Sequence, residues 1–439
     1  MTLSSIWTTA PDSNVAAFSS AVESINLCRL TYVPFFPRII SIDDLNDSLI
    51  ASYLKLSTKQ VGNLRAGKRK LTLRSLLVLS QLADPENYRS FMRDVCPQLT
   101  ESSDCIRKTF EYAAITRDIE LLDNHIETYK CEKRNIIEKY VKVYSFISKY
   151  MHGKVKFDSM NEELDKLSNL NDPILKILVD IYGCITLLHR RQFSYVINKA
   201  SELEVQINGL NDKSHLFLKE CYLYRLSEIL AYAHLFSNNL EEARRYSNIL
   251  LNANINKRVN SDALYIIGMT YLQTDESICL SYLKGSVEVA KELKNERLEG
   301  YAVYNYNFAR ILLSKKVEES APDVLKKVEG FRKGKVSYED ALDCVGKMGD
   351  PDLTGYFEAI SGDRKSLYKK FCDFVSGSNL YYASIIVRDL MEAGECTDFI
   401  KNLTINLRGT SSKKGDVVFE EDFISCFNIG ECVSSRVAV

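Results

Sequence analysis

The stretch Leu264-Tyr-Ile-Ile-Gly-Met-Thr-Tyr-Leu272 decides the fold of this chain. Its apolar residues recur at helical spacing, and Gly268 is a small residue where the first helix of a tetratricopeptide repeat crosses its partner. The sequence predicts that partner helix from Ser277 to Leu293. One repeat earlier, Leu226–Leu235 and Leu240–Leu251 form another pair of expected helices. Equivalent positions lie roughly 35 residues apart, as such repeats require.

The composition also favours an all-α protein. Only 8 prolines and 19 glycines occur in 439 residues, and few helix breakers among many helix formers indicate helices joined by short turns. Stacked helix pairs would bury a shared core and leave a concave groove suited to an extended peptide. An irregular helical bundle is the alternative. Turn signals at Asn171-Asp-Pro173 and Gly349-Asp-Pro351 mark two of the expected helix boundaries.

A second informative stretch, from Ser48 to Ala83, reads SLIASYLKLSTKQVGNLRAGKRKLTLRSLLVLSQLA. Three short helices are expected there, the second beginning at Thr58 after the N-cap Ser57 and ending near Ala66-Gly67. Seven Lys/Arg and no Asp/Glu lie between Lys55 and Arg74, although the whole chain has 57 basic and 58 acidic residues. This pattern predicts a helix-turn-helix DNA-binding unit. A helical hairpin with a solvated basic face is the alternative.

Polar and basic side chains of this stretch are the candidates for DNA contact. We expect Thr58, Lys59 and Asn63 to face base edges, because the spacing of Val61 and Leu64 predicts that these two apolar residues face inward and leave the polar ones outside. The basic residues after that helix would contact phosphates, which position the protein without reading sequence. The predicted DNA-binding set is Ser57, Thr58, Lys59, Gln60, Asn63, Lys68, Arg69 and Lys70.

The sequence lacks the motifs that are typical of metal-binding proteins, of common enzyme classes and of membrane or secreted proteins. The twelve cysteines form no C-x-x-C and the five histidines no H-E-x-x-H, so we expect reduced cysteines, no metal site and no cofactor. No Gly-rich phosphate loop and no G-x-S-x-G occurs, so no catalytic residues are predicted and the chain is not expected to be an enzyme. The absence of a long apolar run and of a secretory signal predicts a cytoplasmic protein.

Several short stretches occur in an order that is typical of one family. They are Phe110-Glu-Tyr-Ala113, Leu240-Glu-Glu-Ala-Arg-Arg-Tyr-Ser247, Arg258, Tyr265-x-x-Gly268, Tyr282-Leu-Lys-Gly285 and Ala393-Gly-Glu395. Together they resemble AimR, the receptor family of the phage arbitrium lysis–lysogeny system. The resemblance implies a dimeric transcription regulator in the bacterial host cell that binds operator DNA and promotes lytic development. A short communication peptide in the repeat groove would switch off DNA binding and favour lysogeny.

The resemblance also implies where the peptide binds. Arg258 matches a family peptide contact, and its guanidinium can pair with a peptide carboxylate. Asn379 stands where the family has an acidic contact, and asparagines that hold the peptide backbone are replaced here by Tyr232, Phe236 and Met269. Asn305 and Asn307 could supply such amides instead. The predicted peptide-binding set is Tyr232, Phe236, Arg258, Met269, Leu272, Asn305, Asn307 and Asn379.

Four regions are expected along the chain. They are an N-terminal helix with an extended linker (1–40), the helix-turn-helix domain (41–98), the repeat domain (99–407) and a tail without an assigned role (408–439). A helix of the first region is expected near residues 15–30, and the tail contains a strand-like run at 416–421.

The C-terminal helix of the repeat domain is expected to serve dimerisation, as it does in the family. Its apolar residues are Phe399, Ile400, Leu403 and Leu407. The alternative function is a tetratricopeptide-type adaptor that sequesters a protein partner in a peptide-dependent way without binding DNA. The local positive charge after the second helix favours the DNA-binding regulator.

Overall fold

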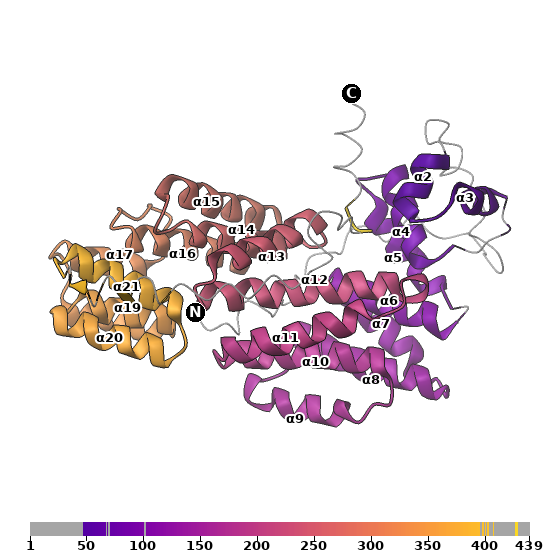
Figure 1. The fold of residues 1–439 in the computed structure, drawn as a ribbon, viewed down its shortest axis with the longest axis horizontal. Coiled ribbons are helices and arrows are strands. Elements are labelled where there is room, and N and C mark those ends of the chain that lie inside the picture. The colour runs from indigo at the N-terminus through magenta and orange to yellow at the C-terminus, as the bar shows by residue number, and fades with distance from the viewer. Residues whose placement is uncertain are drawn as a thin grey trace. The chain divides into compact units, whose positions relative to one another are not determined.

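The computed structural model describes residues 47–66, 68, 71–100, 102–395, 397–398, 400, 402–403, 407 and 426–428. Every regular element in these ranges is a helix (Figure 1). The expected helix near residues 15–30 and the strand-like run at 416–421 lie outside the described residues. None of the described helices combines the length and the apolar character that a membrane crossing requires.

The described residues belong to two compact units. We call residues 47–152, 212–221 and 426–428 the N-terminal unit, and residues 153–211 and 222–407 the repeat unit. One long helix, α12 (Asp212–Phe236), supplies residues to both units.

The N-terminal unit begins with the three short helices that the sequence predicts. Its helices are α2 (Asp47–Leu54), α3 (Thr58–Arg65), α4 (Leu73–Ala83), α5 (Tyr88–Val95), the short 3-10 helix η2 (Cys96–Gln98), α6 (Ser103–Ile115), α7 (Ile119–Tyr129) and α8 (Asn135–Met151). The predicted domain boundary at residue 98 falls between η2 and α6.

The start of α3 has a local cause in the sequence. The amide of Gln60 donates to Ser57 Oγ (3.3 Å), and the amide of Ser57 donates to Gln60 Oε1 (2.9 Å). This reciprocal capping box satisfies two backbone donors that the helix itself cannot satisfy. Val61 and Leu64 are buried, as their spacing predicts. The predicted N-cap and inward face of this helix are therefore confirmed.

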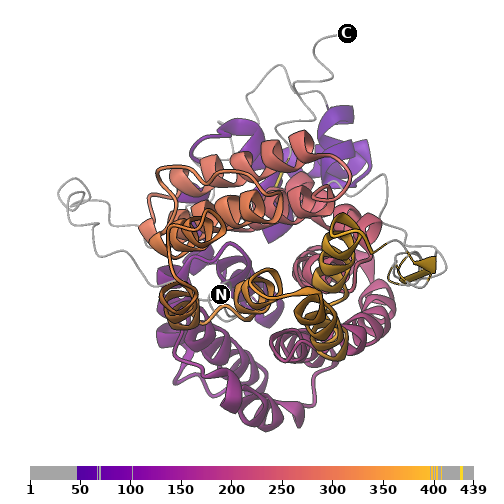
Figure 2. The same ribbon diagram turned by 90° about the vertical axis from the view of Figure 1, so that its left-hand side faces the viewer.

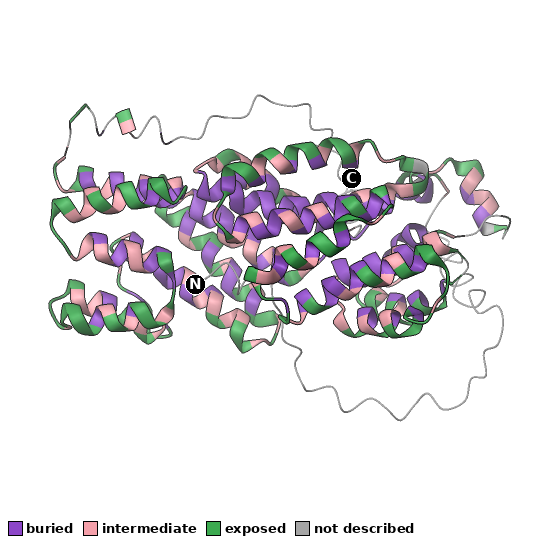
Figure 3. Ribbon diagram, turned by 90° about the horizontal axis from the view of Figure 1, so that it is seen from below, coloured by how far each residue is buried: buried purple, intermediate pink, exposed green. Residues whose placement is uncertain are grey.

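The repeat unit is a succession of helices in which each packs on its neighbour. They are α9 (Phe157–Ser168), α10 (Pro173–His189), α11 (Phe193–Asn208), the second part of α12, α13 (Leu240–Ala253), α14 (Lys257–Thr270), α15 (Glu276–Glu292), α16 (Glu296–Leu312), α17 (Asp323–Arg332), α18 (Tyr338–Met348), α19 (Pro351–Ile360), α20 (Arg364–Ser376) and α21 (Leu380–Glu392). Neighbouring helices lie side by side (Figure 2) and turn buried faces toward one another (Figure 3). The predicted boundaries at Asp172-Pro173 and Asp350-Pro351 are confirmed, because each aspartate caps the helix that the proline begins.

The crossing of α14 and α15 confirms the role of the small residue in the deciding stretch. A Cβ atom on Gly268 would lie 2.9 Å from Leu283 Cγ and 3.0 Å from the carbonyl oxygen of Cys279. Helix α15 agrees with the predicted second helix, whereas α14 begins at Lys257, well before Leu264. The early start follows from a cap, since Asn256 Oδ1 accepts from the amide of Arg258 (2.9 Å). Apolar periodicity did not predict this part of the helix, because its first turn is polar.

Candidate ligand site and DNA-facing surface

A small cavity of about 80 Å³ lies in the repeat unit between α12, α14, α15 and α16. Residues from α19 and α21 and the turn after α10 complete its wall. Four predicted peptide-binding residues line this cavity, namely Tyr232, Phe236, Arg258 and Asn305. The structure therefore brings together side chains that are far apart in the sequence.

Aromatic side chains form one side of the cavity. The rings of Tyr232 and Phe236 stack with centroids 6.3 Å apart, and Phe308 stacks on Tyr382 at 6.2 Å. Burial raises the pKa of Tyr232 well above its ordinary value, so its hydroxyl stays neutral. This side of the cavity therefore offers apolar ring surface to a ligand and few backbone-type hydrogen bonds.

Charged side chains of α14 face the same space. Arg258 and Asp262 stand one helical turn apart, so they lie on one face of the helix, and both line the cavity. Arg258 is only 4% exposed. A guanidinium in so dry a place interacts strongly with a carboxylate that enters the cavity.

A second charged cluster borders the cavity on the side of α19 and α21. Arg191 Nη1 and Nη2 each lie 2.8 Å from a carboxylate oxygen of Asp352, and Asn379 Nδ2 donates to Asp352 Oδ1 (2.9 Å). Burial raises the pKa of Asp352, while the Arg191 guanidinium acts in the opposite direction. Arg191 and Asn379 also line a second hollow of about 420 Å³. The cluster thus borders both the small cavity and this hollow.

Sequence reasoning found Asn379 and missed Arg191, Asp350 and Asp352. The carboxylate of Asp350 accepts from the hydroxyl of Tyr304 (2.5 Å) and caps α19, so it too is held within the wall of the cavity. The turn signal at Gly349-Asp-Pro351 pointed to a helix boundary and gave no hint of a ligand site. No local pattern marks Arg191, because its partner lies 161 residues away.

The structure does not place the other predicted peptide residues on the cavity. Met269 and Leu272 are buried, and the carbonyl of Met269 accepts from the hydroxyl of Tyr381 (2.6 Å). Asn307 is fully buried, and its amide donates to the carbonyl of Val303 (2.9 Å) and accepts from the backbone amide of Glu318 (2.8 Å). Its amide is therefore engaged in holding the turn after α16.

The predicted DNA-facing residues lie on or next to α3. Thr58, Lys59 and Lys68 are exposed and Asn63 is half-buried, whereas Arg69 and Lys70 lie outside the described residues. The side chains of Ser57 and Gln60 are engaged in the capping box, so they position the helix. Arg74 differs from the exposed Lys59 and Lys68 because it is buried against Glu220. Its charge is compensated inside the protein.

The predicted dimerisation residues are partly covered by their own chain. Ile400 and Leu407 are buried, and the carbonyl of Leu407 accepts from Asn238 Nδ2 (2.9 Å). Leu403 is half-buried, and Phe399 lies outside the described residues.

Comparison with known proteins places this arrangement in a family. The model of the AimR transcriptional regulator-like family matches residues 88–327, more than half of the chain. The chain belongs to this family. This match confirms the family that the sequence predicted, a family named for transcriptional regulators. The match begins after α4 and ends before Asp350, so it covers neither α3 nor the cluster of Arg191, Asp352 and Asn379 as a whole.

Individual members agree with this assignment. The AimR transcriptional regulator of Bacillus phage phi3T is 21% identical over 352 residues, which cover 77% of this chain and 90% of that protein. A solved structure of phAimR with a ligand superposes with a TM-score of 0.60 at 18% identity and covers 74% of this chain and 98% of that one. Selenomethionine phAimR gives a TM-score of 0.55 at 16% identity and covers 84% of this chain and 99% of that one. The all-helical architecture is therefore that of the AimR family.

Proposed function

We propose that this chain is a DNA-binding regulator of the phage lysis–lysogeny decision that a short communication peptide switches off. As a homodimer without peptide it would bind operator DNA through α3 and the basic residues after it. Peptide bound in the repeat unit would end that binding. The observation that carries the proposal is the cavity on which Tyr232, Phe236, Arg258 and Asn305 meet.

The chemistry of the cavity supports a particular mode of peptide binding. Arg258 would hold a carboxylate of the peptide, and the rings of Tyr232, Phe236 and Phe308 would cover apolar side chains of the peptide. Asn305 would supply a polar contact to its backbone. A pocket for a ligand of this size usually measures about 300–1,000 Å³. Because the cavity encloses only about 80 Å³, the repeat unit must open to admit a peptide.

The need to open the repeat unit couples peptide binding to a change in the conformation of the protein. A peptide that fits only the opened form shifts the population toward that form. To move a two-state equilibrium from 1:99 to 99:1, the peptide must favour one state by about 5.5 kcal/mol. The Arg191–Asp352–Asn379 cluster borders both the cavity and the hollow of about 420 Å³, and we expect the two spaces to join there.

Calorimetry with candidate peptides tests the receptor half of the proposal. The probes are synthetic short peptides encoded by small reading frames next to the gene. Arg258→Ala should weaken binding of the cognate peptide by about 2–5 kcal/mol, because a carboxylate would be left unpaired in a dry site. Lys257→Ala is the matched control, since Lys257 is the neighbouring cation but is exposed and paired with Glu292. Equal affinities of the parent and Arg258→Ala would remove Arg258 from the site.

Gel-shift titration on the operator tests the DNA half. Lys68→Ala should weaken binding to all DNA sequences and lower the salt-dependence slope by about 0.9, as the loss of one phosphate contact requires. Asn63→Ala should instead relax specificity at one base pair by about 1–3 kcal/mol. Lys284→Ala, an exposed lysine on α15, is the control. A parent chain that binds peptide but never DNA would support the adaptor function instead.

A further inference from the structure

Three residues of the C-terminal tail form part of the N-terminal unit. Cys426 and Phe427 are 1% and 3% exposed, so they are as buried as the core of the unit. They lie about a hundred residues beyond the part of the chain that matches the family. Such burial of a short segment far from the rest of its unit in sequence calls for a structural reason.

Phe427 occupies an aromatic slot between two helices. Its ring stacks on Tyr112 of α6 at 6.2 Å with an interplanar angle of 8°, and it lies 5.9 Å from the ring of Phe217 in α12. Both neighbours are themselves buried. Aromatic rings contribute large apolar contact area, and offset stacking adds to it. Phe427 therefore joins α6 to the first part of α12.

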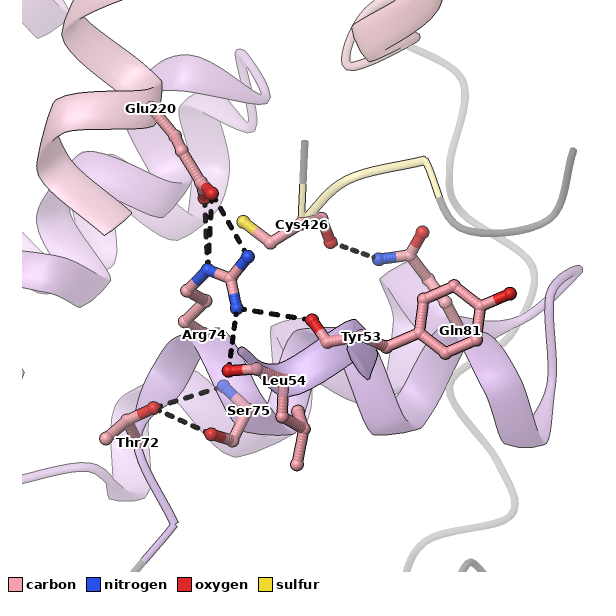
Figure 4. A network of polar contacts seen from close by, with 8 residues as sticks. All are labelled: Tyr53, Leu54, Thr72, Arg74, Ser75, Gln81, Glu220 and Cys426. Carbon is pink, nitrogen blue, oxygen red and sulfur yellow. Dashed lines mark hydrogen bonds and ion pairs between the residues drawn. The ribbon is translucent and has the colours of Figure 1, made fainter. Parts of the chain in front are cut away.

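Cys426 lies over a polar network, which Figure 4 shows from close by. The carbonyl of Cys426 accepts from Gln81 Nε2 of α4 (2.6 Å), and its thiol lies beside the carboxylate of Glu220. Burial raises the pKa of this thiol well above its ordinary value, so it remains protonated and neutral. A neutral cover keeps water away from the charges beneath it without adding another charge.

The network beneath Cys426 joins three helices. Arg74 of α4 donates through Nε and Nη2 to the carboxylate of Glu220 in α12, at 3.1–3.3 Å. Its Nη1 donates to the carbonyls of Tyr53 and Leu54 at the end of α2, at 3.5 and 3.4 Å. The ion pair is nearly dry, with side-chain exposures of 8% and 5%. Its Coulomb attraction is strong only while water stays out, because water raises the local dielectric constant.

We propose that residues 426–428 are an intramolecular clasp that fastens α2 and α4 to α12. The surface that receives the clasp is formed by Gln81, Tyr112, Phe217 and Glu220, and its occupant is the tail of the same chain. The clasp excludes water from the Arg74–Glu220 pair and thereby fixes the helices that precede and follow α3. The tail, for which the sequence suggested no role, thus sets the rigidity of the unit that would face DNA.

Thiol labelling of the full-length chain tests the clasp without DNA or peptide. N-ethylmaleimide is added to the folded protein, and the modified cysteines are quantified by peptide mapping. Cys131 and Cys372 are exposed and serve as internal references. Cys426 should react at least about tenfold more slowly than these two, since a buried thiol with a raised pKa has little thiolate to offer. Cys426 reacting as fast as Cys131 would overturn the proposal.

Hydrogen exchange of two full-length variants tests its consequence. Phe427→Ala should speed both exchange in α2 and α4 and labelling of Cys426, and should leave exchange in α14–α16 unchanged. Tyr195→Ala is the control, because it removes an aromatic ring that is 68% exposed on α11. If Phe427→Ala does not fold, Phe427→Leu gives a milder version of the same loss. Unchanged exchange in α2 and α4 in a folded Phe427 variant would contradict the clasp.

Discussion

Each unit of the molecule buries an arginine–carboxylate pair, and the surroundings of the two pairs differ. In the N-terminal unit, Arg74 and Glu220 are 8% and 5% exposed, and the remaining donors of Arg74 reach carbonyls at the end of α2. In the repeat unit, Arg191 and Asp352 are 25% and 10% exposed, both line the small cavity, and Arg191 also lines the hollow of about 420 Å³. A pair as deeply buried as Arg74–Glu220 holds its helices in a fixed arrangement. A pair that borders empty space, as Arg191–Asp352 does, can rearrange when a ligand enters.

The largest effect is expected from breaking the Arg74–Glu220 pair. Glu220→Ala leaves the Arg74 guanidinium buried without its counter-charge, which typically costs about 3–5 kcal/mol of stability. The free energy of unfolding from urea titration measures the loss. The double variant Arg74→Met with Glu220→Leu should recover most of it, since an apolar pair of similar size avoids the desolvation of charge. If Glu220→Ala cost less than about 1 kcal/mol, the two pairs would not differ as proposed.

Breaking the Arg191–Asp352 pair should cost less free energy of unfolding. Arg191→Met removes the guanidinium, but Asp352 keeps the hydrogen bond from Asn379 and borders the small cavity. We expect a loss of about 2 kcal/mol, within the range for a buried polar group that loses a partner. The same variant should change affinity for the cognate peptide, whereas Glu220→Ala should leave peptide affinity unchanged in folded protein. Calorimetry beside urea titration separates the two outcomes.

Two glycines sharpen the comparison of the units. Gly268→Ala should destabilise the repeat unit by about 1–3 kcal/mol, since its Cβ would meet Leu283 and a backbone carbonyl. Gly62→Ala in α3 should instead stabilise the helix by about 0.5–1 kcal/mol, because nothing lies within 4 Å of its Cβ position. Thermal unfolding of both variants provides the measurement. The same sign for both changes would show that helix packing does not explain Gly268.

The effect expected from a single titrating group is a dependence of stability on pH. Burial lowers the pKa of His234 from its ordinary 6.5 to about 4, and its ring stacks on Tyr246. The folded state therefore keeps this imidazole neutral while the unfolded state takes up a proton below pH 6.5. Stability should fall as the pH drops from 6.5 toward 4, by at most about 1.4 kcal/mol per pH unit for this group.

The histidine contribution can be isolated with one substitution. His234→Phe retains the stack on Tyr246 and lacks the titrating group, so it should lose roughly 1 kcal/mol less stability than the parent between pH 6.5 and 5. Urea titrations at the two pH values measure the difference. Parallel losses in parent and variant would assign the pH dependence to other groups, among them His125 in the N-terminal unit, whose pKa burial also lowers to about 4.

Local patterns in the sequence predicted the helices and failed for contacts between distant residues. The N-cap Ser57 and the boundaries at Asp172 and Asp350 depend on residues within one turn, the crossing at Gly268 follows a repeat pattern, and each was predicted. Arg74 was counted as surface charge, because its partner Glu220 lies 146 residues away.

The residues of the candidate site also fall into those that the sequence could predict and those that only the structure shows. Arg258, Tyr232 and Phe236 were found through the family resemblance, and they line the cavity. Asn307 was named for its amide alone, but that amide is already engaged within the turn after α16. Only the structure shows which polar groups have been used in folding and which face a cavity.

Helix α12 limits how the gene can diverge. It is a single helix of 25 residues, about 37 Å long, and within the N-terminal unit it carries both Phe217, which contacts Phe427, and Glu220, which pairs with Arg74. One inserted residue between them would turn one end against the other by about 100° and advance it by about 1.5 Å. Phe217 and Glu220 could then no longer meet both Phe427 and Arg74 in the same unit. Relatives that share both features should therefore differ by substitution along this helix and show no gaps between the two positions.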